Sequence, residues 1–245
     1  MEKEILLLSY VFIVGALMGW VLEVIYRRIK SPNKKWRNPG LLSGPWLPIY
    51  GFGTSFLYWI AFNLEKLKLD PLCFNVLLFV VCSFVMSFME LVGGSYLYNV
   101  LHIRLWDYRD ERLNYKGYTC LKFFMIWGFT SLVYYHSIHY LLILLVNRYF
   151  SRMGIMSFAV GIVWGVFLVD LWNSMGISLK ISQFAKEKNI VIDFEKVKDI
   201  AKTTGEEESR YAYRAHFFQI PHKERIIDFL IEHEPHISSI HRKDK

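Results

Sequence analysis

Residues 38–53, NPGLLSGPWLPIYGFG, decide how this chain enters its fold. The stretch places four glycines and three prolines among apolar residues, directly after a basic run. Glycine permits positive φ and close backbone approach, whereas proline fixes φ and removes a donor. Such backbone is tolerated at membrane depth only where protein or a water-filled cavity surrounds it. The stretch therefore predicts an irregular, non-helical segment at the point where the chain enters a bilayer. The alternative is a plain loop in which Pro45 and Pro48 start a helix.

The composition around this stretch is that of a membrane protein. The 245 residues are 53% hydrophobic and 17% aromatic, with a mean hydropathy of +0.24, which is high for a soluble domain. The net charge of +7 is concentrated in residues 1–177, which carry +6. Because that excess lies in short loops between apolar segments, it sets orientation and attracts anionic lipid, and no nucleic-acid-binding domain is expected.

Five apolar segments on either side of the stretch are long enough to cross a bilayer, which takes about 20 residues. We expect an all-α polytopic bundle, with residues 1–177 forming the transmembrane domain and residues 178–245 a short soluble cytoplasmic tail. Four or six spans are the alternatives, because the fourth segment has a polar middle. The predicted spans are residues 5–26, 46–64, 72–100, 121–146 and 154–177.

Lysine and arginine predict the orientation of these spans. Eleven basic residues lie in the first and third loops, against five on the other side. The positive-inside rule then places the N-terminus outside the cell membrane and the C-terminus in the cytoplasm.

Three acidic residues fall inside the predicted spans, where a carboxylate is costly and marks a functional hypothesis by default. Glu23 shares a helix face with Gly15 and Gly19, so it is expected to face protein. By depth, Glu23, Glu90 and Asp170 converge on a cytoplasm-facing site for a cation, a proton or a cationic group. The alternatives are an ion pair or snorkelling for Glu23, and a helix cap or interhelical hydrogen bond for Asp170. The predicted substrate or ion pathway also includes Gly44, Pro45, Pro48, Tyr50 and Gly51.

The loop after the third span has the mixed basic and aromatic composition of a membrane interface. We expect it to lie at headgroup level, either binding a phosphate-bearing headgroup or serving as an aromatic anchor with paired charges. The candidate lipid-binding residues are Arg104, Trp106, Asp107, Tyr108 and Arg109.

Motifs for catalysis, metals and cofactors are missing from the sequence. No GxxxxGK[ST] phosphate loop, HExxH, GxSxG or paired CxxC occurs, so an enzyme, a metal site or a bound cofactor is not expected. His136 and His139 share a helix face, but two ligands without a third favour contacts with the adjacent tyrosines over a metal.

Several short motifs together resemble the ABC-transporter type IV permease family. The resemblance covers roughly residues 5–175, and its most specific part is GPxxPIYGxG at residues 44–53. It implies a multi-pass membrane component that works with a separate ATPase subunit, and it names no substrate or catalytic residue. The motifs that carry it are Gly19-Trp20 with Glu23 and Tyr26, residues 40–53, Glu90, Trp106-Asp107-Tyr108, Gly117 with Cys120, Trp127-Gly128 and Asp170.

The sequence thus predicts a permease-like transporter subunit of unknown substrate, in contact with membrane lipids, an ATPase subunit and a homo- or hetero-oligomeric partner. The competing class is a nonenzymatic scaffold or assembly factor whose GxxxG faces and loops bind partner helices or lipids. A third class is an intramembrane lipid-modifying enzyme that uses Glu90 or Asp170 as acid or base.

Overall fold

The computed structural model of the chain describes residues 2–30, 36, 38–144, 153–194, 196–197 and 230–231. Helices dominate these residues, which confirms the expected all-α bundle. The helical elements are α1 (Glu2–Lys30), α2 (Pro48–Glu65), α3 (Pro71–Asn99), α4 (Leu121–Val133), the π-helical turn η1 (Tyr134–His139) and α6 (Met153–Glu187).

Three of the described helices are long and apolar enough to cross a membrane, at Glu4–Ile29, Pro71–Asn99 and Gly154–Glu187. Large apolar side chains point outward from them; Phe88, Phe158 and Trp172 are 65%, 71% and 78% exposed. A soluble protein would bury such side chains, whereas lipid solvates them. The chain is therefore a membrane protein.

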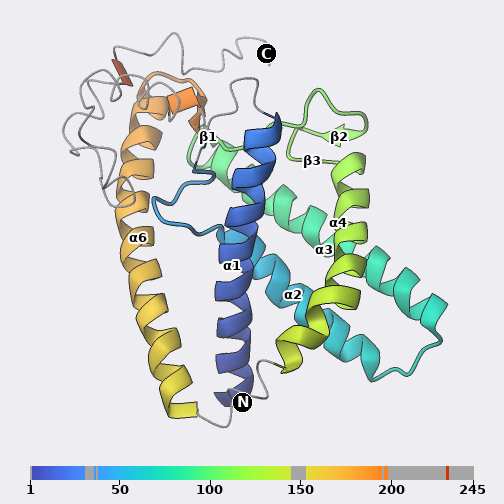
Figure 1. The fold of residues 1–245 in the computed structure, drawn as a ribbon. Helices are drawn as coiled ribbons and strands as arrows, with labels where there is room; N and C mark the ends of the chain where they lie inside the picture. The colour runs from blue at the N-terminus through green and yellow to red at the C-terminus, as the bar shows by residue number, and fades with distance from the viewer. Residues whose placement is uncertain are drawn as a thin grey trace.

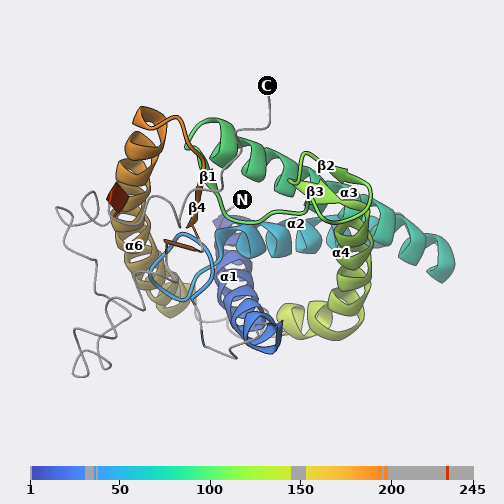
Figure 2. The ribbon, with the colours of Figure 1, turned by 90° about the horizontal axis from the view of Figure 1, so that it is seen from above.

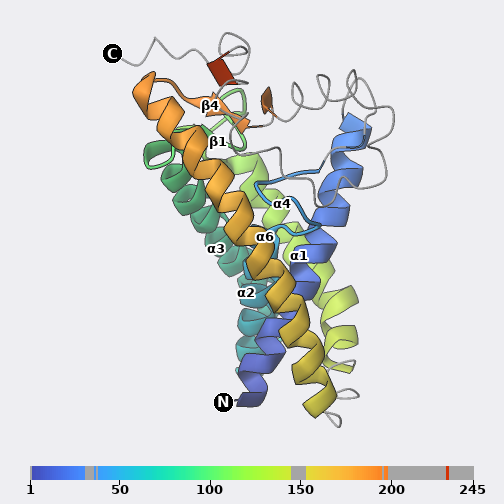
Figure 3. The same cartoon turned by 90° about the vertical axis from the view of Figure 1, so that its left-hand side faces the viewer.

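The two short strand pairs lie at one end of the bundle, which we call the strand end (Figures 1 and 3). β1 (Ile103–Arg104) pairs in parallel with β4 (Ile192–Asp193), and β2 (Asn114–Tyr115) pairs antiparallel with β3 (Thr119–Cys120). The N-terminus lies at the opposite end.

Helix α6 runs ten residues past the predicted span end at 177, to Glu187. Its last turns bury Ile181 and Phe184 against Ile103 of β1 and Ile192 of β4, in a core at the strand end that also contains Leu230. This part of the predicted tail packs on the bundle through apolar contacts, whereas most of residues 198–245 lies outside the described chain.

Viewed from above, α1 lies between α6 and α4, with α2 and α3 crossing on one side (Figure 2). The GxxxG glycines of α1 let α2 approach closely. A Cβ on Gly15 would lie 2.4 Å from Thr54 Oγ1, and a Cβ on Gly19 would lie 2.3 Å from Tyr50 Cβ. The predicted packing face of the first helix is therefore confirmed, and its partner is α2.

The second GxxxG gives a matched control for this close approach. A Cβ on Gly161 or Gly165 of α6 meets no described atom within 4 Å. We expect Gly19→Ala to destabilise the fold by about 1–3 kcal/mol, because α1 and α2 must separate, and Gly161→Ala to be neutral or stabilising by about 0.5–1 kcal/mol. Thermal unfolding of the two purified variants measures this difference, and equal behaviour would show that the α1–α2 packing is wrong.

Candidate functional site

The Pro/Gly stretch runs down into the bundle between α1 and α6. The N–H of Leu47 donates to the carbonyl of Ala16, halfway along α1, at 3.1 Å, so α2 begins at that depth. Leu42 and Trp46 are buried against Phe12 and Phe167 from the two helices. Non-helical backbone at this depth is covered by protein, as the bilayer requires.

Asp170 of α6 holds the backbone of this stretch. Its carboxylate accepts the N–H of Ser43 at 3.2 Å and the N–H of Gly44 at 2.9 Å. A Cβ on Gly44 would lie 2.9 Å from Asp170 Oδ2, so glycine allows the carboxylate to come close. Ser174 lies 3.4 Å from the same carboxylate and also accepts from the Ser43 N–H, at 3.3 Å. Asp170 therefore fixes the loop to α6. The sequence alternative of a hydrogen bond to a neighbouring helix is similar, except that the donors here are backbone groups of a loop.

Glu23 of α1 faces α2, as its position on the GxxxG face predicts. Its carboxylate accepts the Tyr50 hydroxyl at 3.1 Å and pairs with Arg27 Nε at 2.8 Å. The ion pair with Arg27, one helical turn away, compensates the charge. The charge of Glu23 is therefore compensated by Arg27, and its carboxylate also fixes the position of the Tyr50 side chain.

Glu90 is the most deeply buried acid among the described residues, with 3% of its surface exposed. Its two carboxylate oxygens accept the Tyr108 hydroxyl at 3.3 Å and the Thr119 hydroxyl at 3.2 Å. No described residue forms an ion pair with Glu90. The carboxylate is thus supported by neutral donors, without a compensating cation among the described residues.

Trp127 of α4 bridges these two acidic centres. Its ring packs edge-on against Tyr50 with centroids 5.8 Å apart. Its buried indole N–H faces the Glu90 carboxylate without forming a hydrogen bond of normal geometry. Burial first, and then the Glu90 carboxylate, raise the pKa of Tyr108, and Tyr50 and Glu23 add to this effect.

These side chains form one polar cluster near the strand end, which we call the Glu90 network. It draws residues from α1, α2, α3, α4 and the loop between α3 and α4. The Glu90 network consists of Glu23, Arg27, Tyr50, Glu90, Tyr108, Thr119 and Trp127.

The structure thus joins Glu23, Tyr50, Glu90 and Tyr108 and places Asp170 on the Pro/Gly stretch instead. Gly51, a predicted pathway residue, packs on α1: a Cβ there would lie 2.8 Å from the Phe12 carbonyl oxygen. Pro48 is the first residue of α2, which agrees with the alternative in which proline starts a helix. Sequence reasoning did not single out Thr119 or Trp127 as site residues, although Trp127 belongs to the motifs of the resemblance.

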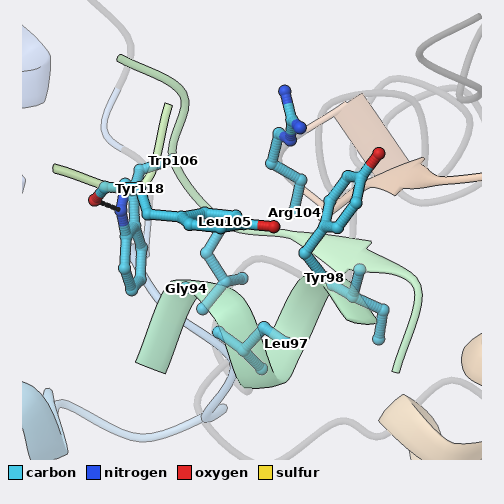
Figure 4. Close-up of a pocket in the computed structure, with 8 residues that line it drawn as sticks. Gly94, Leu97, Tyr98, Arg104, Leu105, Trp106 and Tyr118 are labelled. Atoms are coloured by element: carbon cyan, nitrogen blue, oxygen red, sulfur yellow. Dashed lines mark hydrogen bonds between the residues drawn. The ribbon is translucent and has the colours of Figure 1, made fainter. Parts of the chain in front are cut away.

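The loop between α3 and α4 is held mainly by its own charged and aromatic residues. Asp107 pairs with Arg104 Nη1 at 2.7 Å and with Arg109, and Trp106 donates to the carbonyl of Tyr118 at 2.9 Å (Figure 4). These pairs are the geometry expected of an aromatic anchor with paired charges. Headgroup binding by this loop stays a prediction.

Asp107 gives the loop a pH dependence of known sign. Partial burial opposes its ionisation, but hydrogen bonds from Arg109 and Arg104 outweigh it and lower the pKa of Asp107 to about 2, below an unfolded value of about 3.9. The stabilisation is therefore complete above about pH 4 and is lost as the pH falls through about 2.

We expect Asp107→Asn to reduce hydrogen-exchange protection of the Tyr108 N–H, which donates to Gly117 at 3.0 Å. The reduction is expected to be the same from pH 5 to pH 8, after correction for intrinsic exchange. An unprotected Tyr108 amide in the wild-type protein, or full protection in the variant, would contradict this role.

Comparison with known proteins supports the membrane assignment. A family model described as "Putative ABC-transporter type IV" matches residues 10–175, about two thirds of the chain. The matched range contains every residue of the Glu90 network and Asp170. No curated protein and no solved structure matches the chain.

Proposed function

Because the chain belongs to the ABC-transporter type IV family, we propose that it is the permease-like, membrane-spanning subunit of a transporter. In this proposal a cation, a proton or a cationic group binds transiently at the Glu90 network. The Pro/Gly stretch shapes the wall of the pathway next to it, and Asp170 keeps that wall in place.

The observation that carries the proposal is that Glu90 is buried and has no ion-pair partner among the described residues. A carboxylate at membrane depth costs about 2.5–3.5 kcal/mol even on the lower scales, and evolution retains such a cost mainly where it serves a function. Glu90 is 3% exposed and its described partners are two hydroxyl groups. A purely structural role would be served by an ion pair, as Glu23 has with Arg27.

The number of membrane spans and their orientation are part of the same proposal. In addition to the three long apolar helices, α2 and the helix formed by α4 and η1 cross the bilayer, which gives five spans. The N-terminus is then outside and the strand end faces the cytoplasm, as the distribution of lysine and arginine favours.

The chain supplies no motor of its own in this account, since its sequence contains no phosphate-binding loop. The proposed partner is a separate ATPase subunit that docks at the strand end, where α1 ends after Arg27 and Arg28 and the loop between α3 and α4 carries Arg104 and Arg109. The chain itself is proposed to be nonenzymatic.

Purification of the tagged chain from native membranes in mild detergent, followed by quantitative mass spectrometry, tests this proposal. The expected result is a co-purifying ATPase with a phosphate-binding loop in an amount comparable to the chain. Recovery of the chain alone, or only with proteins that lack such a loop, would overturn the ATP-driven permease.

A membrane scaffold is the second candidate, and one observation favours it. The glycines of the GxxxG in α6 are exposed and contact no described atom, and small residues at such spacing let another helix approach. A scaffold predicts that Gly161→Leu disrupts a complex, whereas Glu90→Gln leaves it intact; the permease predicts that Glu90→Gln abolishes activity.

A further inference from the structure

A second polar cluster lies at the end of the bundle opposite the Glu90 network, around the π-helical turn η1 (Figure 1). His139 at its centre is completely buried, with 0% of its surface exposed. Its Nε2 atom lies 3.6 Å from Glu65 Oε1 on α2 and has no hydrogen-bond partner. A buried, unpartnered ring nitrogen that faces a carboxylate is a costly arrangement unless it receives a ligand.

The π-helical geometry is what assembles this cluster. The hydroxyl of Tyr134 lies 3.4 Å from His139 Nδ1, and the hydroxyls of Tyr135 and Tyr140 lie 3.0 Å apart. Both pairs are five residues apart, a spacing that in an α-helix would separate them by about 140° around the axis. The wider turn brings them together, and π turns of this kind concentrate at functional sites.

Glu65 connects the buried imidazole to the surface of the bundle. Its side chain is 31% exposed, it ends α2 next to the turn that leads to α3, and its Oε1 accepts the Tyr135 hydroxyl at 3.0 Å. When Nδ1 of His139 carries the ring proton and donates it to the Tyr134 hydroxyl oxygen, the lone pair is on Nε2, on the side that faces Glu65. The carboxylate therefore lies between the surface of the bundle and the ring.

We propose that His139 and Glu65 form a proton-binding site that is loaded from the end of the bundle where the α2–α3 turn lies. One proton passes from water through the Glu65 carboxyl to the imidazole, whose nitrogen lone pair forms the new N–H bond. The product is an imidazolium beside a carboxylate, which compensate each other's charge. Contraction of the 3.6 Å gap to hydrogen-bond length draws the end of α2 toward η1.

Glu65 is the carboxylate of this cluster, and the remaining titratable groups are tyrosine hydroxyls, a thiol and the imidazole of His136, which packs on the Tyr135 ring. Four tyrosine rings have centroids 5.3–5.7 Å from the His139 ring, at Tyr58, Tyr134, Tyr135 and Tyr140. Cys82 of α3 lies beside Tyr134, and Tyr10 of α1 packs on the same core. No described residue offers a competing carboxylate to His139.

The experiment is a pH titration of the purified full-length protein in nanodiscs, with histidine ¹³C-labelled at Cε1 and followed by NMR. His139→Gln assigns the resonance by its disappearance. The matched control is His136→Gln, which removes a histidine on the same turn whose described hydrogen bond is to Asn75, at 3.1 Å. Thermal unfolding of each variant establishes that it is folded.

The proposal predicts that the His139 resonance titrates and that Glu65→Gln weakens its proton affinity about tenfold or more, since the nearby opposite charge is gone. His136→Gln leaves the curve unchanged. Tyr135→Phe acts in the opposite direction, because the carboxylate loses a competing donor and binds the imidazolium more strongly, and it replaces Glu65→Gln if that variant does not fold. A His139 that does not titrate between pH 4 and 9, or that titrates identically without the Glu65 carboxylate, would overturn the site.

Discussion

Asp170→Ala is expected to destabilise the fold by about 2–4 kcal/mol, the largest effect on stability that we predict for one side chain. The carboxylate accepts two backbone N–H groups, from Ser43 and Gly44. A hydrogen bond to a charged group contributes about 1.5–3 kcal/mol, and the N–H of the buried Gly44 is left without a partner, whereas the Ser43 N–H keeps its contact with Ser174. The Pro/Gly stretch has no regular secondary structure to satisfy the Gly44 N–H otherwise.

The measurement is thermal or denaturant unfolding of purified variants in the same detergent. Asp170→Asn keeps one acceptor oxygen and is expected to lose about half as much. Ser174→Ala, which removes the longer contact to the Ser43 N–H at 3.3 Å, serves as the matched control with a loss below about 1 kcal/mol. An Asp170→Ala variant as stable as wild type would show that the stretch is not held by α6.

Glu90→Gln is expected to reduce activity at least tenfold while it changes stability by less than about 1.5 kcal/mol. The amide has nearly the same shape, and the Tyr108 and Thr119 hydroxyls can each donate or accept. What the substitution removes is the negative charge, on which the binding of a cation or a proton depends. The effect therefore separates function from folding.

Complementation of a native strain that lacks the chain measures this activity, with unfolding of the same variants as the check on folding. Glu111→Gln is the matched control, because Glu111 pairs with Lys122 on the exposed loop and is expected to tolerate the change. Full complementation by Glu90→Gln would remove the Glu90 network from the mechanism.

The contacts that the sequence predicts correctly lie within one helix or between helices with a strong packing signal. Gly15, Gly19 and Glu23 share a face because residues three or four apart meet on a helix surface, and that face contacts α2 as expected. The burial of Glu90 is predictable because a carboxylate in an apolar run must face protein. These inferences need only the periodicity of the helix.

Contacts that depend on loops or irregular turns could not be read from periodicity. Tyr108 and Thr119 reach Glu90 only after the loop between α3 and α4 folds back on the bundle. The pairing of Tyr134 with His139 depends on a π turn, which no regular spacing predicts. Asp170 was expected near Glu90 from its depth, but depth does not specify direction around the helix, and Asp170 faces the Pro/Gly stretch instead.

Side-specific labelling of one introduced thiol tests the central claim most directly, namely that the Glu90 network opens to water on one side of the membrane. Ser87 lies one turn before Glu90, and its hydroxyl is buried without a partner. Ser83, a further turn away, is 0% exposed. Each serine is replaced by cysteine in a background in which Cys73, Cys82 and Cys120 are alanine.

A membrane-impermeant maleimide is then applied from either side of sealed vesicles. The account predicts that Ser87→Cys reacts only from the side of the strand end and that Ser83→Cys reacts from neither side. Reaction of Ser87→Cys from the opposite side, or its complete lack of reaction from both, would contradict a pathway that opens at the Glu90 network.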